Sequence, residues 1–377
     1  MDVVALLSSL VAANSVNPSL VPGAPGEAAA ADVAAAAMRG AGLDVVRQDV
    51  AQGRPNVIGV LDGRARGPAI MLCGHLDTVG VEGMVDPFVP RVDGNRLYGR
   101  GAQDMKGGVA AMIAAAADVA PRWTAGRLIV ACVADEEHMS LGAEALVREF
   151  RADMAVVTEP TDLQVAVGHK GFAWVGILTH GRAAHGSRPD EGRDAIAYMG
   201  RVLTALEARD RELRARPPVP FQGTGSLHAS IISGGRELSS YPDRCALQME
   251  RRTVIGENDA VVLAEVNAML NDLRARDPAF TAEARVVASR PAYATSADHP
   301  LPRTLCAALS RAGRASAPTG MSFWTDAAIL AGAGIPSVLF GPGGAGLHSA
   351  EEYVKLDDVE VCRDVLVAAI GAIVGSS

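Results

Sequence analysis

AIMLCGHLD, at residues 69–77, joins a short apolar run to a histidine and an aspartate. A continuous apolar run of this length is typical of a strand that is buried on both faces of a sheet. Three further runs have the same form and also lead into polar loops, namely residues 128–134, 154–157 and 337–340. Helical stretches lie before, between and after these runs, at residues 28–40, 107–120 and 356–374 among others. This alternation predicts an α/β fold with a mostly parallel central sheet flanked by helices.

The middle of the chain has a different pattern. Its strands alternate more strictly between apolar and polar residues, which is typical of a sheet with one open face. The expected elements are strand 172–179, helix 194–208, strand 227–233, strand 244–251, helix 259–274 and strand 282–287. The order β-α-β-β-α-β is that of a ferredoxin-like unit. We therefore expect one α/β domain, formed by residues 1–169 and 288–377, with an α+β domain inserted at residues 170–287.

Composition excludes several classes of protein. The chain has 377 residues, of which 49% are hydrophobic, so it is not intrinsically disordered. Its 43 acidic and 35 basic residues give a net charge of −8, which argues against a nucleic-acid partner. The longest apolar runs are too short to span a bilayer, so no membrane partner is expected. The five cysteines contain no CxxC pair and indicate no disulfide framework. A cytoplasmic protein is the expectation.

Each of the four apolar runs leads to a histidine or a carboxylate. The polar residues concerned are His75 and Asp77, Glu136 and Glu137, Glu159, and His348. In open α/β sheets, sites form beyond the carboxyl ends of the strands, so we expect these side chains to converge. Asp104 is a further candidate, because it lies in the glycine-rich segment GRGAQDMKGG at residues 99–108. Any one of them alone has an ordinary structural interpretation, and it is their joint occurrence that indicates a site.

Five motifs carry a resemblance to a known family. They are HLD at residues 75–77, GAQDMKG at 101–107, DEE at 135–137, TEPT at 158–161 and HSAEE at 348–352. Together they resemble the co-catalytic zinc amidohydrolases, a family that includes acetylornithine deacetylase, succinyl-diaminopimelate desuccinylase, aminoacylase and glutamate carboxypeptidase. The resemblance covers essentially the whole chain and includes the inserted domain.

The resemblance implies a centre of two zinc ions, with cobalt as a possible substitute. His75 and Glu159 would bind one ion, Glu137 and His348 the other, and Asp104 would bridge both. These side chains supply the nitrogen and oxygen ligands that zinc accepts. A bridging carboxylate also offsets charge between cations about 3.5–4 Å apart.

The resemblance also implies three catalytic roles. Glu136 would be the general base that takes a proton from the attacking water. Asp77 would orient the imidazole of His75. His185, in the segment GRAAHGSRP at residues 181–189, would reach across a dimer interface and polarise the carbonyl that is attacked. A homodimer through the inserted domain, which would also serve as a lid, follows from that role.

Substrate contacts are implied for Arg252, Ser239, Trp324 and Thr325. Arg252 aligns with an arginine that grips a substrate carboxylate, although Arg251 would face the opposite side of the same strand. Two segments depart from the family pattern, namely SSYP at residues 239–242 and FWTD at residues 323–326. These departures bear on the acyl group and side chain that the pocket accepts, and they leave the expected metal ligands in place.

The predicted function is hydrolysis of the amide bond of a small N-acyl amino acid or dipeptide-like substrate. Acetylornithine deacetylase-like activity is the first choice, because TEPT and the segment FGPG at residues 340–343 resemble that branch most. Desuccinylase and dipeptidase or carboxypeptidase activities are alternatives. A catalytically silent dimer that binds metal and amino-acid derivatives is a further alternative, against which the presence of Glu136 argues.

Overall fold

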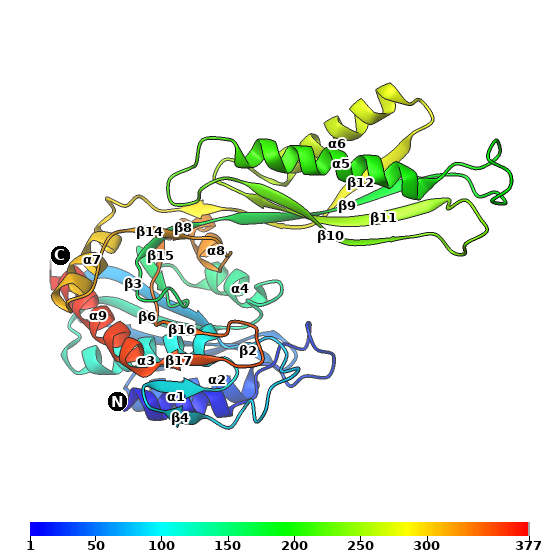
Figure 1. The fold of residues 1–377 in the computed structure, drawn as a ribbon. Coiled ribbons are helices and arrows are strands. Elements are labelled where there is room, and N and C mark those ends of the chain that lie inside the picture. The colour runs from blue at the N-terminus through cyan, green and yellow to red at the C-terminus, as the bar shows by residue number, and fades with distance from the viewer. Residues whose placement is uncertain (376–377) are drawn as a thin grey trace. The chain divides into compact units, whose positions relative to one another are not determined.

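The computed structural model describes residues 1–375, which form two compact units (Figure 1). The first unit contains Met1–Gly168, Thr295–Gly320 and the C-terminal part of the chain from Thr325. The second unit contains His169–Ala294 together with Met321–Trp324. The chain thus leaves the first unit, forms most of the second, and returns.

The first unit is built on a mixed sheet with the strand order β1-β2-β6-β3-β7-β15-β8. These strands are β1 (Asp44–Ala51), β2 (Arg54–Asp62), β6 (Ala125–Val133), β3 (Ala65–His75), β7 (Met154–Val157), β15 (Ser337–Leu339) and β8 (Ala166–His169). The central four, β6, β3, β7 and β15, are parallel to one another, whereas the outer strands pair antiparallel. The expected α/β fold with a mostly parallel sheet is confirmed.

Helices cover both faces of this sheet (Figure 1). One face carries α1 (Val3–Ala12), α2 (Ala28–Gly40), α3 (Gly107–Val119), α7 (Pro300–Arg311) and α9 (Leu356–Gly375). The other face carries α4 (Leu141–Glu149) and α8 (Ala327–Gly332). Because α3 is alanine-rich and almost wholly buried, it packs closely between the sheet and α9. No helix among residues 1–375 combines the length and apolar character needed to cross a membrane.

A small second sheet in the first unit was not expected from the sequence. It has the order β16-β17-β5-β4, from β16 (Gly344–Ala345), β17 (Tyr353–Lys355), β5 (Arg96–Tyr98) and β4 (Arg91–Asp93). Its strands have two or three residues each, too few for a hydrophobic period to show in the sequence. The sheet pairs segments that lie more than 250 residues apart in the chain.

The second unit is a four-stranded antiparallel sheet with two helices on one face (Figure 1). Its elements follow the expected β-α-β-β-α-β order, as β9 (Gly171–His180), α5 (Ala195–Arg214), β10 (Ser226–Gly234), β11 (Arg244–Thr253), α6 (Asp259–Arg276) and β12 (Thr281–Arg290). The sheet order β10-β11-β9-β12 is that of a ferredoxin-like unit. The short strands β13 (Tyr293–Ala294) and β14 (Thr319–Met321) lie in the connecting segments.

Helix α5 is longer than the sequence predicted. The expected end at residue 208 is wrong, because the helix continues to Arg214. Leu206 and Leu213 are both buried, and their spacing of seven residues places them on one helix face. Packing of Leu213 into the core of the unit therefore stabilises the helical conformation of this segment, although most of its side chains are charged.

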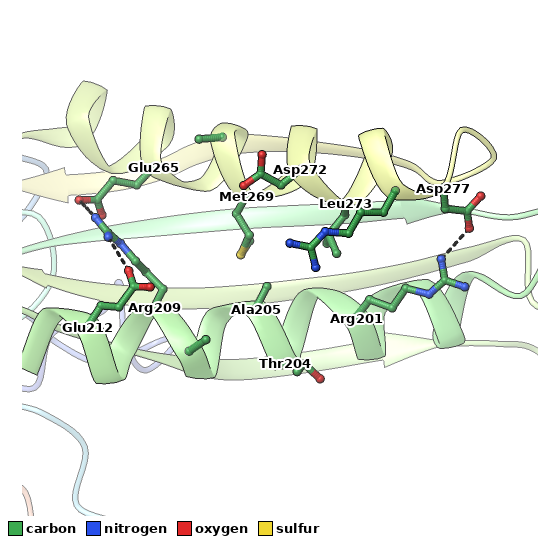
Figure 2. Close-up of a pocket in the computed structure, with 13 residues that line it drawn as sticks. Arg201, Thr204, Ala205, Arg209, Glu212, Glu265, Met269, Asp272, Leu273 and Asp277 are labelled. Carbon is green, nitrogen blue, oxygen red and sulfur yellow. Dashed lines mark hydrogen bonds and ion pairs between the residues drawn. The ribbon is translucent and has the colours of Figure 1, made fainter.

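Helices α5 and α6 enclose an open groove with a volume of about 1120 Å³ (Figure 2). Its floor is apolar and includes Ala205, Met269 and Leu273. Ion pairs close both ends, between Arg201 and Asp277 at one end and from Arg209 to Glu212 and Glu265 at the other. None of the predicted site residues lines this groove.

Candidate metal centre

The parallel strands deliver ligand side chains to one edge of the sheet. His75 is the last residue of β3, and its strand neighbours are β6 and β7. The segment 135–137 follows β6, Glu159 follows β7, and the loop that carries His348 follows β15. Because parallel strands end at the same edge, the expected convergence is a direct consequence of the topology.

Asp104 reaches the same place from a different element. It lies in an irregular turn, Ala102–Lys106, between β5 and α3, and the Asp104–Met105 peptide bond is cis. The turn begins at Gly101, whose φ of +80° is a conformation that favours glycine. The Asp104 side chain is 16% exposed and points toward both candidate histidines.

Five of the predicted ligands form two groups that share Asp104. His75, Asp104 and Glu159 make one group, and Asp104, Glu137 and His348 make the other, with the ligand atoms of each group within 4.8 Å of one another. The Nε2 atom of His75 lies 3.1 Å from one Asp104 oxygen, and that of His348 lies 3.3 Å from the other. His348 is also 3.2 Å from Glu137. One carboxylate thus faces two imidazoles through its two oxygens.

The charges at this centre fit divalent cations. Burial, reinforced by neighbouring carboxylates, raises the pKa values of Glu136, Glu137 and Glu159. Hydrogen bonds to Asp104 and Glu137 raise the pKa of His348 to about 10. One oxygen of Glu137 is buried and has no hydrogen-bond partner among the described residues. Clustered, partly unsatisfied carboxylates and imidazoles of this kind suit zinc or a similar ion in both charge and donor type.

Asp77 holds the segment that carries Glu136 and Glu137. Its carboxylate accepts hydrogen bonds from the backbone N–H groups of both glutamates, each at 3.1 Å. The Nδ1 atom of His75 lies 2.9 Å from the backbone carbonyl of Asp77 and 3.6 Å from its carboxylate. Asp77 therefore contacts His75 chiefly through its main chain, while its side chain positions the glutamates.

A buried ionic network beneath this segment was not found from the sequence. Arg54, which is 5% exposed, donates to Glu27 at 2.5 and 2.9 Å and to Asp135 at 2.7 Å. Asn17 donates to both Asp77 and Asp135, at 2.8 and 3.0 Å. These residues come from five separate segments, and only Asp77 in HLD and Asp135 in DEE follow an apolar run within a motif. No local pattern could have identified Asn17, Glu27 or Arg54.

Two residues of the FWTD segment belong to the first unit. Thr325 is 1% exposed, and its hydroxyl oxygen accepts a hydrogen bond from the N–H of Ala327 at the start of α8. Asp326 is also 1% exposed and contributes to raising the pKa values of Glu136 and Glu159. Asp326 was not predicted as a charge beside the centre, because the FWTD segment departs from the family pattern at this point.

His185 and Ser239 lie on adjacent loops of the second unit. The N–H of Gly186 donates to the carbonyl of Ser239 at 2.7 Å, and the backbones of His185 and Ser240 form an isolated antiparallel β-bridge. The Nδ1 atom of His185 is 2.8 Å from the hydroxyl of Ser187. Ser187 thus engages the Nδ1 atom of the ring and not the Nε2 atom.

The two neighbouring arginines of β11 face opposite sides of their sheet. Arg251 is 1% exposed and pairs with Glu257 at 2.8 Å, whereas the side chain of Arg252 is 27% exposed. Trp324 stacks edge-on against Phe172, with ring centroids 6.2 Å apart, and its indole donates to the carbonyl of Pro291. Of the two arginines, Arg252 is therefore the accessible one.

Comparison with known proteins is consistent with these features. Residues 71–372 match the family described as Peptidase family M20/M25/M40. The chain is 31% identical to acetylornithine deacetylase of Myxococcus xanthus over 360 residues, which cover 91% of this chain and 92% of the relative. It is 29% identical to N-formyl-4-amino-5-aminomethyl-2-methylpyrimidine deformylase of Bacillus subtilis, over 86% of this chain and 84% of the relative. These matches confirm the resemblance that the five motifs carry.

Solved structures share the fold. A tripeptidase from Staphylococcus aureus superposes with a TM-score of 0.80 at 19% identity, covering 99% of this chain and 98% of that one. A Bacillus subtilis protein described as a dinuclear metal-binding peptidase superposes with a TM-score of 0.77 at 16% identity, covering 100% and 98% of the two chains. At such identities the comparison establishes a common architecture.

Proposed function

The chain belongs to peptidase family M20/M25/M40 and is a hydrolytic enzyme, and from that premise we propose that it cleaves the amide bond of a small N-acyl amino acid. One observation carries the proposal. Five side chains form two ligand groups joined by Asp104, while Glu136, at the same place, belongs to neither group. A carboxylate left free beside a dinuclear centre is what a general base requires.

We propose that His75 and Glu159 hold one cation, that Glu137 and His348 hold the other, and that Asp104 bridges them. When bound, two such cations polarise an amide carbonyl and lower the pKa of a water molecule. The backbone of Glu137 is fixed by Asp77, so its carboxylate is held toward His348. Zinc suits this mixed nitrogen and oxygen donor set, and cobalt is a proposed substitute.

Glu136 is the proposed base. Its side chain is 12% exposed, and one oxygen lies 3.9 Å from Nε2 of His75, so it borders the first ligand group without joining it. Burial raises its pKa, which favours a carboxylate that takes up a proton and then releases it to the leaving amine. The N–H of Glu136 donates to the same Asp77 carboxylate as the N–H of Glu137, so Asp77 fixes the backbone of both residues.

We also propose that the enzyme is a homodimer through its inserted unit and that His185 acts on the partner's substrate. Strand β10 is at an edge of its sheet, and Ile231 and Ile232 on it are 61% and 52% exposed. An exposed apolar edge strand favours pairing with another chain. If the proposal holds, mixing His185→Ala protomers with Glu136→Gln protomers restores part of the activity through hybrid dimers. No recovery after proven subunit exchange would reject the shared site.

The proposed substrate carries a free carboxylate, which Arg252 would bind through its guanidinium fork. N-Acetylornithine is the first choice, since the relative from Myxococcus xanthus bears that activity in its name. Ser239, Trp324 and Thr325 are proposed to shape the rest of the pocket. Arginine biosynthesis and a cytoplasmic location follow from this choice and stay predictions.

The test is amine release by the purified, metal-loaded enzyme. The substrates are N-acetylornithine, other N-acetyl, N-formyl and N-succinyl amino acids, and dipeptides. Glu136→Gln is the blank, and Glu149→Gln, on the surface of α4, is the matched control. Turnover of one acyl series that Glu136→Gln abolishes and Glu149→Gln retains would support the proposal. Turnover of dipeptides alone would replace deacylation by peptidase activity, and no turnover with two bound metals would favour a silent binding protein.

A further inference from the structure

Glu352 lies behind the metal centre and is buried, with 1% of its surface exposed. One oxygen of its carboxylate accepts hydrogen bonds from the Arg100 guanidinium at 2.6 Å and from the N–H of Gly101 at 3.0 Å. The other oxygen accepts from the N–H groups of Gln103 and Asp104, at 2.9 and 3.0 Å. This single carboxylate therefore satisfies three backbone N–H groups of the loop that carries the proposed bridging ligand Asp104.

Arg100 connects the loop that carries Asp104 to the loop that carries His348. Its Nη2 atom donates to the carbonyl of Ser349 at 2.9 Å, and its Nε atom donates to the carbonyl of Gly80 at 3.0 Å. Ser349 is the residue directly after His348. The guanidinium, 3% exposed, thus ties the loop that carries His348 to the loop that carries Asp104.

The small sheet of the first unit sets up this arrangement. Strand β17 begins directly after Glu352 and pairs antiparallel with β5, which ends directly before the Asp104 loop. Consequently the last residue of β5, Tyr98, pairs with the first residue of β17, Tyr353. The loop that follows β5 and carries Asp104 therefore meets the loop that precedes β17 and carries His348. The N–H of Gly99 also donates to the backbone carbonyl of Glu352, at 3.1 Å.

We propose that Glu352 and Arg100 are positioning residues for the second metal, which Asp104, Glu137 and His348 would hold. The inference rests on the dinuclear centre of the proposed function and adds an asymmetry to it. The first group takes His75 from the end of β3 and Glu159 from just after β7, in the middle of the large sheet, and only Asp104 from the loops that Glu352 and Arg100 join. The second group takes two of its three members from the loops that Glu352 and Arg100 join. Loss of the clamp therefore weakens the second site more than the first.

Glu352→Gln is a sharp perturbation of this clamp. The glutamine has one acceptor oxygen, so either the pair Gln103 and Asp104 or the pair Arg100 and Gly101 faces an NH₂ group instead. Two donors then oppose a donor in a buried place, and the Arg100 charge loses its partner. Glu351→Gln makes the same chemical change one residue earlier, at an exposed side chain, and is the matched control.

The experiment titrates Zn²⁺ into metal-free wild type, Glu352→Gln and Glu351→Gln, and reads both dissociation constants by competition with a chelator. Changes to residues that orient metal ligands typically cost about 10- to 100-fold in affinity. We expect Glu352→Gln to weaken the second site by at least about tenfold on that basis, with a clearly smaller change at the first. Glu351→Gln should match the wild type at both sites, and excess Zn²⁺ should restore much of the turnover of Glu352→Gln.

Other outcomes overturn the inference. Wild-type affinity at the second site of Glu352→Gln, or equal weakening at both sites, would show that the clamp does not position the second metal. Wild type that binds fewer than two Zn²⁺ would instead reject the dinuclear centre itself. If Glu352→Gln does not fold, Arg100→Lys decides the question, because lysine keeps the charge and cannot make all three contacts. In Arg100→Lys the affinity of the second site must then fall more than that of the first, and an equal loss at both sites would reject the proposal.

Discussion

Replacing Arg54 by methionine leaves two buried carboxylates without their cation. Glu27 and Asp135 are both 0% exposed, and Arg54 contacts them through three hydrogen bonds. Asp135 links this network to the proposed base, because it directly precedes Glu136 in the chain. Arg54→Met keeps a similar apolar stem in place, so the change removes chiefly the charge and the donors.

The expected loss follows from burial. Removing one partner of a buried ion pair typically costs about 3–5 kcal/mol of unfolding free energy. A Coulomb energy of about 4 kcal/mol for charges 4 Å apart at an effective dielectric of 20 gives the same scale. The exposed pair Arg127–Asp62 has an equally short contact of 2.6 Å, with side chains 50% and 58% exposed. Arg127→Met should therefore cost no more than about 1 kcal/mol.

The assay is urea unfolding of both variants, together with Glu27→Gln and the double variant. Glu27→Gln should recover part of the loss caused by Arg54→Met, because the double variant removes one uncompensated charge. The cost of Arg54→Met should also shrink as the pH is lowered. Burial already raises the pKa of Glu27, and losing Arg54 raises it further. A carboxyl with a raised folded-state pKa stabilises the fold below that pKa and loses this contribution as the pH rises.

Equal losses for Arg54→Met and Arg127→Met would refute this reasoning, because burial would then not be what sets the strength of the pair. A loss for Arg54→Met that is independent of pH between 5 and 8, with no recovery in the double variant, would also refute it. In that case packing of the arginine stem, and not its charge, would hold the segment.

Three further predictions concern packing and metal binding. Gly108→Ala should destabilise the first unit by about 1–3 kcal/mol, because the added Cβ would lie 1.9 Å from the carbonyl oxygen of Thr158. Gly200→Ala, on α5, adds a Cβ in open space and should be neutral or stabilising when both variants are unfolded in urea. His348→Ala should reduce the bound metal from two ions to one, while His138→Ala, outside both ligand groups, should retain two by elemental analysis. Removing the metals with a chelator should lower the melting temperature more at pH 8 than at pH 6. The clustered glutamates have raised pKa values and repel one another once they are ionised. An equal fall in melting temperature at both pH values would contradict this prediction.

Much of the fold was readable from local patterns. The apolar runs at residues 128–134, 154–157 and 337–340 correspond to β6, β7 and β15, because strands buried on both faces are continuous in sequence. The order of elements in the inserted unit was also predicted. By contrast, β1, α1, α4 and the small sheet were missed, since their short or mixed sequences carry no clear period.

The sequence by itself predicted the five side chains that the structure brings together in two candidate ligand groups, because each of them follows a strand or precedes a helix within a recognisable motif. Only the tertiary structure decided what holds those side chains in place. Three hydrogen-bonded pairs, Arg54 with Glu27, Asn17 with Asp77, and Arg100 with Glu352, are brought together from segments far apart in the chain. Their roles depend on burial and on long-range strand pairing, and neither property is encoded in any local stretch of residues.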